Sequence, residues 1–528
     1  MERPMWVLQI SVAVGLLPAI MVLFSSYLSV VAVAAVILCR MAESVVCESD
    51  KYMEERHQIL KMEKYMFIGG NTVMSEKEMQ VNKIIMKDKL AELTLGYENI
   101  TNFLPSQHFF KAKPKINSSK VFSTLKKIPK GASLHTHLLA GVSVDFIMDN
   151  FTYRENVYGC DLNGTFKLIV LRTADQDKRC QWKALAEYRR NDPNFDNWLR
   201  KQLSLVVENP HETYPTADIA WSHFKKIFTT EFDLISYSPF FREYIQQLLK
   251  ELYLDNVMYT EIRGTFMSLY DLNGTKYDNE YFFNAFIETV EEFKRGHPDF
   301  LGVRYIHSIY RGVTSEVLKS GLEELIELKR KFPDFIVGFD FVGYEEEGKS
   351  LLDFHEILME ASKDLKFYFH AGETNWFGHT DLNLVDAVLL NTSRIGHGFG
   401  LDKHPVLIKI AKEKEMCVEL CPISNQVLML IQDPRNHPMV SLMAKGFPVV
   451  ICNDDPSVWE ATGLSYDWYY VFMAMTSRTA GIETLKQFAL NSIKYSSMEN
   501  NEKLNALKLW EKAWEKFLDE MIDASSHI

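Results

Sequence analysis

Gly131-Ala-Ser-Leu-His-Thr-His137 is a short run of small and apolar residues that ends in two histidines, a pattern typical of a barrel β-strand. Alternate residues of a strand point to the same side, so His135 and His137 can both face the barrel axis and bind one ion. A histidine pair of this spacing is common in unrelated strands. Its meaning therefore depends on whether the rest of the chain repeats the pattern.

The same pattern, an apolar run followed by a metal-binding side chain and a turn, recurs at three further places. They are Phe367-Tyr-Phe-His-Ala-Gly-Glu373 with His370, Arg394-Ile-Gly-His-Gly398 with His397, and Val449-Val-Ile-Cys-Asn-Asp-Asp-Pro456 with Asp454. In a (β/α)8 barrel the active site is built from the C-terminal ends of several strands. Three imidazoles and a carboxylate suit Zn²⁺ and leave one position open for water, although iron and cobalt take the same donors. The sequence therefore predicts a mononuclear metal site for hydrolysis.

Eight β-type apolar runs follow one another along the chain, and helical patterns separate them from the second run onward. The runs are residues 131–137, 257–263, 302–307, 335–341, 366–370, 394–397, 416–420 and 448–453. Examples of the helical patterns are Val317–Lys331 and Asp381–Asn391. Alternating strands and helices indicate a parallel sheet, and eight such units indicate closure. We expect an α/β protein, a (β/α)8 TIM barrel within residues 126–528.

Two further segments do not belong to the repeated units. The interval 138–256 is far longer than a loop between a strand and its helix, so it must hold an insertion. Its front part, about residues 150–205, reads as a small subdomain, and its rear part, Ala217–Phe232, as a helix that could cover the barrel mouth. Residues 45–125 are helical in pattern and rich in Met, Lys and Glu. Such an arm has no core of its own, so we expect it to pack on the barrel or on a second subunit.

The N-terminal segment predicts export. The stretch from Met5 to Cys39 has no charged residue. It is longer than the apolar region of a typical signal peptide and long enough for a membrane-spanning helix. We expect residues 1–44 to be a cleaved signal, with cleavage between Ala34 and Ser44. A permanent type II membrane anchor is the alternative. Either reading sends the rest of the chain into the secretory pathway and predicts a secreted, extracellular protein.

Other features agree with export. Cys160 and Cys180 lie in a polar stretch and could close a disulfide in an oxidising compartment, whereas Cys417, Cys421 and Cys452 read as small buried hydrophobes. Six Asn-X-Ser/Thr sequons predict a glycoprotein: Asn99, Asn117, Asn150, Asn163, Asn273 and Asn391. The net charge of −12 argues against nucleic acid as a partner.

Three residues beside the predicted metal ligands could carry out the chemistry. Glu373 follows His370 by three residues, where a carboxylate can act as general acid or base toward a bound water. His397 is either a fourth imidazole ligand or a base that orients the attacking water. Asp454 and Asp455 are adjacent, so one can bind the metal while its neighbour receives a hydrogen bond from the substrate.

These residues resemble the metal-dependent adenosine deaminases, with H-x-H, H-A-G-E, G-H-G and D-D-P in that order. More closely, the chain is similar to the secreted adenosine deaminase-related growth factors, the adenosine deaminase 2-like group, over nearly everything after about residue 50. The blocks that carry the resemblance are Lys130-Gly-Ala-Ser-Leu-His-Thr-His137, Asp255-Asn-Val-Met-Tyr-Thr-Glu-Ile-Arg263, Gly338-Phe-Asp-Phe-Val-Gly343, His370-Ala-Gly-Glu-Thr374, Asn391-Thr-Ser-Arg-Ile-Gly-His-Gly-Phe399, Cys421-Pro-Ile-Ser-Asn-Gln-Val-Leu428 and Leu464-Ser-Tyr-Asp467.

The resemblance implies specific roles. Glu373 would protonate the purine ring nitrogen, and His397 would orient the attacking water without binding the metal. Asp455, the backbone of Gly343 and Trp221 would contact the substrate. The ligands of one zinc ion per subunit would be His135, His137, His370 and Asp454. The resemblance further implies that the arm before residue 125 forms a homodimer and that Cys160 pairs with Cys180.

Two positions depart from the family pattern, and both lie on the sugar side. Secreted members resemble H-x-H-D and cytosolic relatives H-x-H-L-D, but this chain reads His135-Thr-His-Leu-Leu-Ala140, with Leu138 after the pair. A substrate-facing histidine of the family's D-H-R pattern is replaced by Tyr310. Each lost hydrogen bond to a buried hydroxyl costs about 1–3 kcal/mol. Adenosine binding would weaken accordingly.

Three functions are therefore weighed. The first is extracellular deamination of adenosine or deoxyadenosine to inosine and ammonia, with growth-factor-like action through adenosine removal. The second is the same chemistry on another purine, suggested by Leu138 and Tyr310. The third is a secreted growth factor that acts on a cell-surface receptor without catalysis. A nucleic-acid deaminase is disfavoured because the H-x-E and P-C-x-x-C zinc signature is absent from the sequence and the net charge has the wrong sign for a polyanion.

Overall fold

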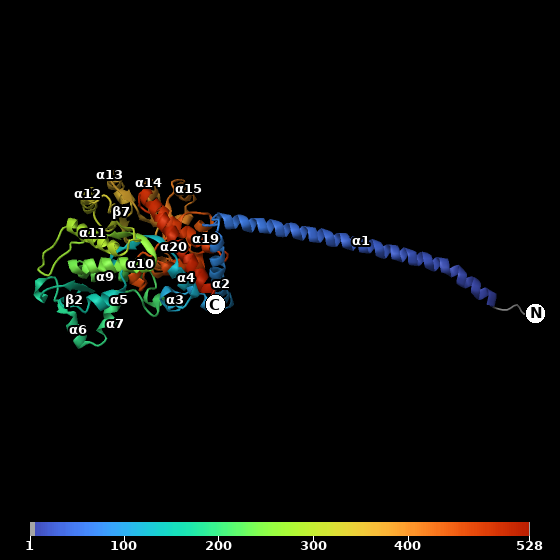
Figure 1. Cartoon of the computed structure of the whole chain (residues 1–528), viewed down its shortest axis with the longest axis horizontal. Helices are drawn as coiled ribbons and strands as arrows, with labels where there is room; N and C mark the ends of the chain where they lie inside the picture. The colour runs from blue at the N-terminus through green and yellow to red at the C-terminus, as the bar shows by residue number, and fades with distance from the viewer. Residues whose placement is uncertain (1–5, 527–528) are drawn as a thin grey trace, which may run out of the picture. The chain divides into compact units, whose positions relative to one another are not determined.

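The structure, a computed structural model, describes the backbone of residues 6–526 and the side chains of residues 27, 29–41 and 49–525. The chain divides into two units, Met1–Tyr65 and Met66–Ile528. The first unit consists of most of α1 (Trp6–Met66), a continuous helix, and the second holds every strand in the described part of the chain (Figure 1).

No helix in the described part of the chain is long and apolar enough to cross a membrane. The predicted signal or anchor segment, residues 1–44, has most of its side chains outside the described residues. Export and the choice between a cleaved signal and an anchor therefore stay predictions.

The core of the second unit is a ring of parallel strands. Parallel pairing runs in the order β1-β5-β6-β7-β8 and again in the order β12-β11-β10-β9. The strands are β1 (Gly131–His137), β5 (Val257–Gly264), β6 (Gly302–Tyr310), β7 (Ile336–Val342), β8 (Lys366–Phe367), β9 (His370–Ala371), β10 (Arg394–His397), β11 (Cys417–Leu420) and β12 (Val449–Ile451).

Two features close these sheets into one barrel. A parallel bridge between Thr136 and Asp454 joins β1 to the end of β12. β8 and β9 are two halves of one strand position, and Tyr368 between them still donates its N–H to Phe339 O of β7 at 3.0 Å. The predicted (β/α)8 barrel is thus confirmed, with eight strand positions among the described residues.

Amphipathic helices cover the barrel from outside. α12 shows the reason, since its buried residues Leu318, Leu322, Leu325 and Leu328 recur on one face at helical spacing. The predicted helix 381–391 is observed as a 3-10 turn followed by α14. The helices after the strands are α10 (Ser238–Leu254), α11 (Asn279–Gly296), α12 (Ser315–Lys331), α13 (His355–Ala361), α14 (Asn383–Leu389), α15 (Pro405–Glu413), α16 (Pro422–Val427), α17 (Pro438–Ala444) and α19 (Ile482–Lys494).

The insertion after the first strand is a small three-stranded antiparallel sheet of order β3-β2-β4, with β2 (Val157–Leu162), β3 (Thr165–Val170) and β4 (Lys183–Ala184). Asn163 and Gly164 both have positive φ, 55° and 77°, as a tight hairpin turn requires. A disulfide joins Cys160 to Cys180. The predicted disulfide-stapled insertion is confirmed.

α9 (Ala217–Ile235) follows the insertion and lies at the mouth of the barrel, packed on β3 and on the 3-10 turn Leu138–Ala140 that ends β1. Its N-terminus is capped by Thr216, whose hydroxyl accepts the N–H of Ile219. The predicted helix over the mouth is therefore present, and it forms one wall of the site.

The segment before the barrel packs on it rather than standing apart. α2 (Glu76–Glu98) begins with a capping box between Ser75 and Glu78, and α3 (Phe109–Ile116) and α4 (Lys120–Lys127) follow. α2 lies against α19 and the C-terminal helix α20 (Asn500–Ser526). Glu78 accepts hydrogen bonds there from Lys486 at 2.7 Å and from the indole of Trp514 at 2.9 Å. A homodimer through this arm stays a prediction, as does the domain boundary at residue 125.

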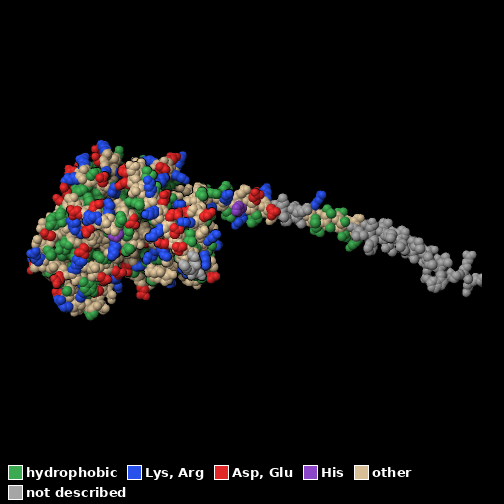
Figure 2. Space-filling model, in the orientation of Figure 1, with side chains coloured by type: hydrophobic (Ala, Val, Ile, Leu, Met, Phe, Trp, Pro, Cys, Tyr) green, Lys and Arg blue, Asp and Glu red, His purple; other side chains and the backbone are tan. Residues whose placement is uncertain are grey.

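The surface of the second unit carries charges of both signs. On the face in Figure 2, Lys and Arg side chains are interspersed with Asp and Glu. The asparagines of the six predicted sequons are all exposed: Asn99, Asn117, Asn150, Asn163, Asn273 and Asn391. Their positions are therefore compatible with glycosylation, which stays a prediction.

Candidate active site

The metal-ligand candidates converge at the C-terminal end of the barrel strands. One side-chain donor atom from each of His135, His137, His370 and Asp454 lies within 4.8 Å of every other. Asp454 Oδ1 is 3.2 Å from Nε2 of both His135 and His137. His397 lies beside them, with Nε2 at 3.6 Å from Asp454 Oδ2. β1, β9, β10 and the end of β12 thus bring together all five residues that the sequence singled out.

The convergent atoms are left with unused bonding capacity. Within the described part of the chain, His135 Nε2, His397 Nε2 and Asp454 Oδ1 are buried and have no hydrogen-bond partner. Buried polar atoms are otherwise almost always paired, so a cluster of unpaired lone pairs is suited to bind a cation. Three imidazole nitrogens and a carboxylate are a donor set that suits zinc. The residues present therefore fit a metal ion.

Cys421 also lies in this cluster, which sequence reasoning did not anticipate. It offers a donor atom within 4.8 Å of those of His135, His397 and Asp454. Burial raises the pKa of the Cys421 thiol, so it stays protonated, and only the thiolate is a good metal ligand. The set with His137 and His370 is therefore the better candidate.

Two of the histidines are oriented by buried carboxylates. His135 Nδ1 lies 2.8 Å from Glu419 Oε2, and His370 Nδ1 lies 2.7 Å from Asp340 Oδ2. A carboxylate that accepts the Nδ1 proton leaves Nε2 free to bind a metal. Sequence reasoning missed Glu419 and Asp340, although both are acidic residues inside apolar strands, which was the available signal.

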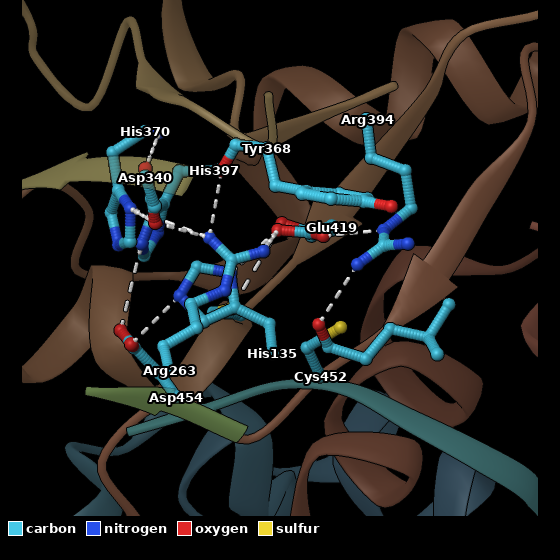
Figure 3. A network of polar contacts seen from close by, with 12 residues as sticks. His135, Arg263, Asp340, Tyr368, His370, Arg394, His397, Glu419, Cys452 and Asp454 are labelled. Carbon is cyan, nitrogen blue, oxygen red and sulfur yellow. Dashed lines mark hydrogen bonds and ion pairs between the residues drawn. The ribbon is translucent and has the colours of Figure 1, made fainter. Parts of the chain in front are cut away.

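These carboxylates are held in turn by two buried arginines (Figure 3). Arg263 donates to Asp340 Oδ2 at 2.6 Å and to Glu419. Arg394 donates to Glu419 Oε1 and to Glu261 Oε2, both at 2.6 Å. Burial alone would favour the neutral acids, but the neighbouring cationic groups lower the pKa values of Asp340 and Glu419. Both carboxylates therefore remain ionised beneath the metal site.

Glu373 lies in the turn after β9 and faces the cluster. Its backbone N–H donates to Glu345 Oε1 at 2.8 Å, and that of Gly372 donates to Glu345 Oε2 at 3.1 Å. Gly372 has φ 72°, and a Cβ there would come within 2.7 Å of the Leu384 side chain. Burial, with Asp454 and Glu345 nearby, raises the pKa of Glu373 well above its usual value. Glu373 is therefore a protonated acid next to the metal-ligand candidates.

Two site residues have strained backbones. His397 and Asp454 adopt left-handed conformations, with φ 58° and 57°. Such conformations in non-glycine residues cost about 1–3 kcal/mol and persist only where the surroundings impose them. Burial lowers the pKa of His397, so its imidazole is neutral.

A cavity of about 520 Å³ opens above the cluster. Its floor is formed by His137, His370, Asp454, Glu373 and Asp455, and α9 supplies an aromatic wall. The apolar side chains that line it are Leu138, Leu139, Trp221, Phe224, Phe228, Phe232, Met267, Val342 and Leu428. This volume is in the range of small-molecule sites. The cavity can therefore hold a flat, largely apolar ring system over the floor.

The structure also places the predicted substrate-side residues on this cavity. Trp221, Gly343, Asp455 and Tyr310 all line it, and Tyr310 is 46% exposed at the rim. Burial and the adjacent Asp454 raise the pKa of Asp455, whose Oδ1 has no hydrogen-bond partner in the described chain. Lys225, which sequence reasoning missed, lines the rim and forms an ion pair with Glu347.

Comparison with known proteins gives a consistent picture. The chain matches the family profile described as adenosine deaminase over residues 204–512 and the profile adenosine/AMP deaminase N-terminal over residues 31–125. It is 42% identical to adenosine deaminase 2 of Sus scrofa over 480 residues, which is 89% of this chain and 94% of that protein. It is 41% identical to adenosine deaminase 2 of Homo sapiens over 475 residues, covering 88% and 93%.

Solved structures share the fold at lower identity. Arabidopsis ADAL complexed with IMP matches with a TM-score of 0.54 and 17% identity, covering 74% of this chain and 99% of that one. A cog1816 amidohydrolase from B. ambifaria with bound Zn matches with a TM-score of 0.53 and 19% identity, covering 77% and 95%. At such identities the likeness concerns the barrel fold alone.

Proposed function

Because the chain belongs to the adenosine deaminase family of hydrolytic deaminases, we propose that it is a zinc enzyme that converts adenosine or deoxyadenosine to inosine and ammonia. The observation that carries this proposal is the cluster of unpaired His and Asp donor atoms beside a protonated Glu373. That arrangement supplies both a metal position and an acid at one end of a cavity of suitable size.

The proposed reaction is an addition followed by an elimination. Water adds to the purine carbon that carries the amine, a ring nitrogen takes up a proton, and the amine leaves as ammonia. His135, His137, His370 and Asp454 would hold zinc. A bound zinc ion lowers the pKa of water and so provides a nucleophile at neutral pH. The remaining steps fall to the side chains around it.

Three side chains have suitable positions for those steps. Glu373 is buried and protonated, so it can give its proton to the ring nitrogen, where the proton remains in the product. Its carboxylate can then take up the proton released as the added hydroxyl becomes a carbonyl, while the other proton of the water leaves with the ammonia. His397 Nε2 lies near Asp454 Oδ2, where it can orient the attacking water. Asp455, with its raised pKa, can donate a hydrogen bond to a purine nitrogen and help to fix the ring.

Substrate choice rests on the walls of the cavity. The aromatic and aliphatic side chains of α9 suit a purine, and the Arabidopsis relative of the same fold was solved with IMP. Leu138 and Leu139 line the cavity where their aliphatic side chains cannot hydrogen bond a sugar. This favours a second candidate, the same chemistry on a purine whose ribose is altered or absent.

We propose a secreted glycoprotein and homodimer whose growth-factor-like action follows from adenosine removal. The exposed sequons, the Cys160–Cys180 disulfide and the similarity to adenosine deaminase 2 support this setting. A receptor-mediated function without catalysis is the competing view, and it predicts that an inactive Glu373→Ala protein keeps its biological activity.

Ammonia release from adenosine by the purified full chain, with its metal content measured, tests the proposal. We expect turnover that is lost in Glu373→Gln, which keeps the side-chain size and the metal ligands. Turnover of 2′-deoxyadenosine, adenine and N6-substituted purines by the same preparation ranks the substrates. Zinc-loaded protein that releases ammonia from none of these compounds would overturn the proposal.

A further inference from the structure

His397 is held by a buried chain of hydrogen bonds that begins at a backbone amide. Met439 N–H of α17 donates to His437 Nδ1 at 3.1 Å. His437 Nε2 lies 3.0 Å from Asn425 Oδ1, and Asn425 Nδ2 lies 3.2 Å from His397 Nδ1. Asn425 is 0%, His397 1% and His437 2% exposed, so water does not compete for these contacts.

The direction of every bond in this chain follows from the first one. A backbone amide can only donate, so His437 Nδ1 must be an acceptor. Burial lowers the pKa of His437 to about 3, so its neutral ring carries one proton, on Nε2. That proton goes to Asn425 Oδ1, which orients the side-chain amide. The NH2 group of Asn425 then donates to His397 Nδ1.

One neighbouring group could compete for His397 Nδ1. Glu373 Oε1 lies 3.4 Å from this nitrogen. A protonated Glu373 would donate to Nδ1 and leave the tautomer as it is, so only an ionised Glu373 would need the proton on Nδ1. In the described chain Glu373 Oε1 has no hydrogen-bond partner, so the contact lacks hydrogen-bond geometry. A proton on Nδ1 would also face the NH2 group of Asn425, donor against donor. The amide contact therefore determines the tautomer.

We propose that Asn425 and His437 are positioning residues that hold His397 in the tautomer with its proton on Nε2. This nitrogen faces the metal-ligand candidates and has no hydrogen-bond partner among the described residues, so its N–H is free to donate. On the proposed function, on which this inference rests, the acceptor is the attacking water.

The residues around His397 and Asn425 are also constrained by the surrounding structure. His397 has a left-handed backbone, φ 58°, and Gly398 follows it with φ 53°. The ring of Phe399, next along the chain, packs edge-on against that of His437 at 5.0 Å between centroids. The backbone of Asn425 is fixed as well, since its main-chain carbonyl oxygen accepts the N–H of Leu430 at 2.9 Å. A rigid scaffold thus transmits the orientation of Met439 N–H to the site.

The decisive variant is Asn425→Asp, which keeps the shape but can only accept hydrogen bonds. Asp at this position would accept hydrogen bonds from His437 Nε2–H and from His397 Nδ1–H, and so would reverse the tautomer of His397 without removing a contact. We expect kcat for adenosine to fall about 10–100-fold, with KM, zinc content and Tm little changed. His437→Gln, which can still donate to Asn425, should keep most of the activity, whereas His437→Leu should not.

Asn491→Asp is the matched control, because Asn491 of α19 is also buried and donates to Val449 O of β12 at 3.0 Å without touching His397. This variant measures how much kcat falls when a carboxylate is buried away from His397. Equal losses of kcat in Asn425→Asp and Asn491→Asp would overturn the inference. So would a loss in Asn425→Asp that appears only in KM or in zinc content.

A readout that needs no turnover separates this inference from the proposed function. ¹⁵N NMR of the histidine-labelled, zinc-loaded full chain distinguishes protonated from unprotonated ring nitrogens, and the missing signals of His397→Gln assign His397. We expect Nε2 protonation in the wild type and Nδ1 protonation in Asn425→Asp. The same tautomer in both proteins would refute the inference. The expected tautomers without adenosine turnover would count against the proposed function only.

Discussion

At the scale of the residue, the site is shaped by buried charged groups beneath the metal-ligand candidates. His135 and His370 are oriented by Glu419 and Asp340, which in turn depend on Arg263. Breaking a buried charge pair by removing one partner costs several kcal/mol because the other charge is left unpaired. The orientation of the metal-ligand candidates is therefore set by the barrel core.

Replacing Asp340 tests this dependence. Asp340→Asn keeps the size of the side chain but loses the charge that holds the Nδ1 proton of His370 at 2.7 Å. We expect zinc affinity to fall about 10–100-fold, measured by competition with a chelator. Glu261→Gln is the control, because Glu261 pairs with Arg394 in the same network without touching a metal-ligand candidate. Equal affinities in the two variants would contradict the role of Asp340.

Glu231 of α9 predicts a dependence of stability on pH. It is 2% exposed, its Oε1 has no partner in the described chain, and burial raises its pKa well above the usual value. The folded state therefore holds a proton that the unfolded chain loses above pH about 4.3. Stability from this group is present below that pH and is lost as pH rises toward the folded pKa.

Glu231→Gln should remove this loss of stability with rising pH. We expect the Tm of the variant, relative to wild type, to rise between pH 5 and pH 7.5, measured by calorimetry on metal-loaded protein. Glu323→Gln on the exposed face of α12 is the control and should show no such trend. A Tm difference for Glu231→Gln that is the same at both pH values would argue against a buried neutral acid.

At the scale of the element, long loops and helices added to the barrel make the site. α9 provides one wall of the cavity, and the disulfide-linked insertion supports it through β3. α2, which precedes the barrel in the chain, packs against α20, which follows it. α9, α2 and α20 bury apolar faces against the rest of the second unit, whereas the insertion also has a small core of its own, formed by Cys160, Ile169, Leu171 and Trp182.

Lys89 anchors α2 to the barrel. Its buried ammonium donates to Thr476 Oγ1, Ser477 O and Ala480 O, each at 3.0 Å. Lys89→Met would keep the packing and leave these acceptors unpaired, so we expect a loss of about 1–3 kcal/mol in the free energy of unfolding. Chemical denaturation measures it, and Lys87→Met, at an exposed position of the same helix, is the control. An unchanged midpoint would exclude an anchoring role.

At the scale of the whole molecule, the barrel brings residues from distant parts of the chain to one point. The donor atoms of His135 and Asp454 lie 3.2 Å apart although the residues belong to the first and last strand positions. Closure of the ring at the bridge between Thr136 and Asp454 makes this possible. An ion bound by His135 and Asp454 would link the first strand position to the last.

Metal removal should therefore destabilise the whole second unit. A ligand that binds only the folded state adds about 4 kcal/mol at a concentration 1,000-fold above its Kd. We expect chelation to lower the Tm, and re-addition of zinc to restore it, in a scan of metal concentration. In His135→Ala/His137→Ala the Tm should no longer respond to zinc. A response that persists in this double variant would place the stabilising ion elsewhere.

The sequence by itself determined the strand order, the insertion and the positions of the metal-ligand candidates. Strand periodicity is local, and a histidine pair or an Asp-Asp-Pro turn at a strand end is visible without tertiary contacts. The same local signals predicted the helix over the mouth, observed as α9.

Only the tertiary structure decided which atoms support the candidates. Glu419 and Asp340 look like isolated acids within apolar strands, and Asn425 and His437 lie in loops and helix ends with no spacing that links them to His397. Their partners are set by barrel closure and by the packing of α16 and α17, which bring together residues far apart in the chain. Hydrogen-bond direction, tautomer and pKa depend on these contacts, because each is a property of neighbours in space rather than in sequence.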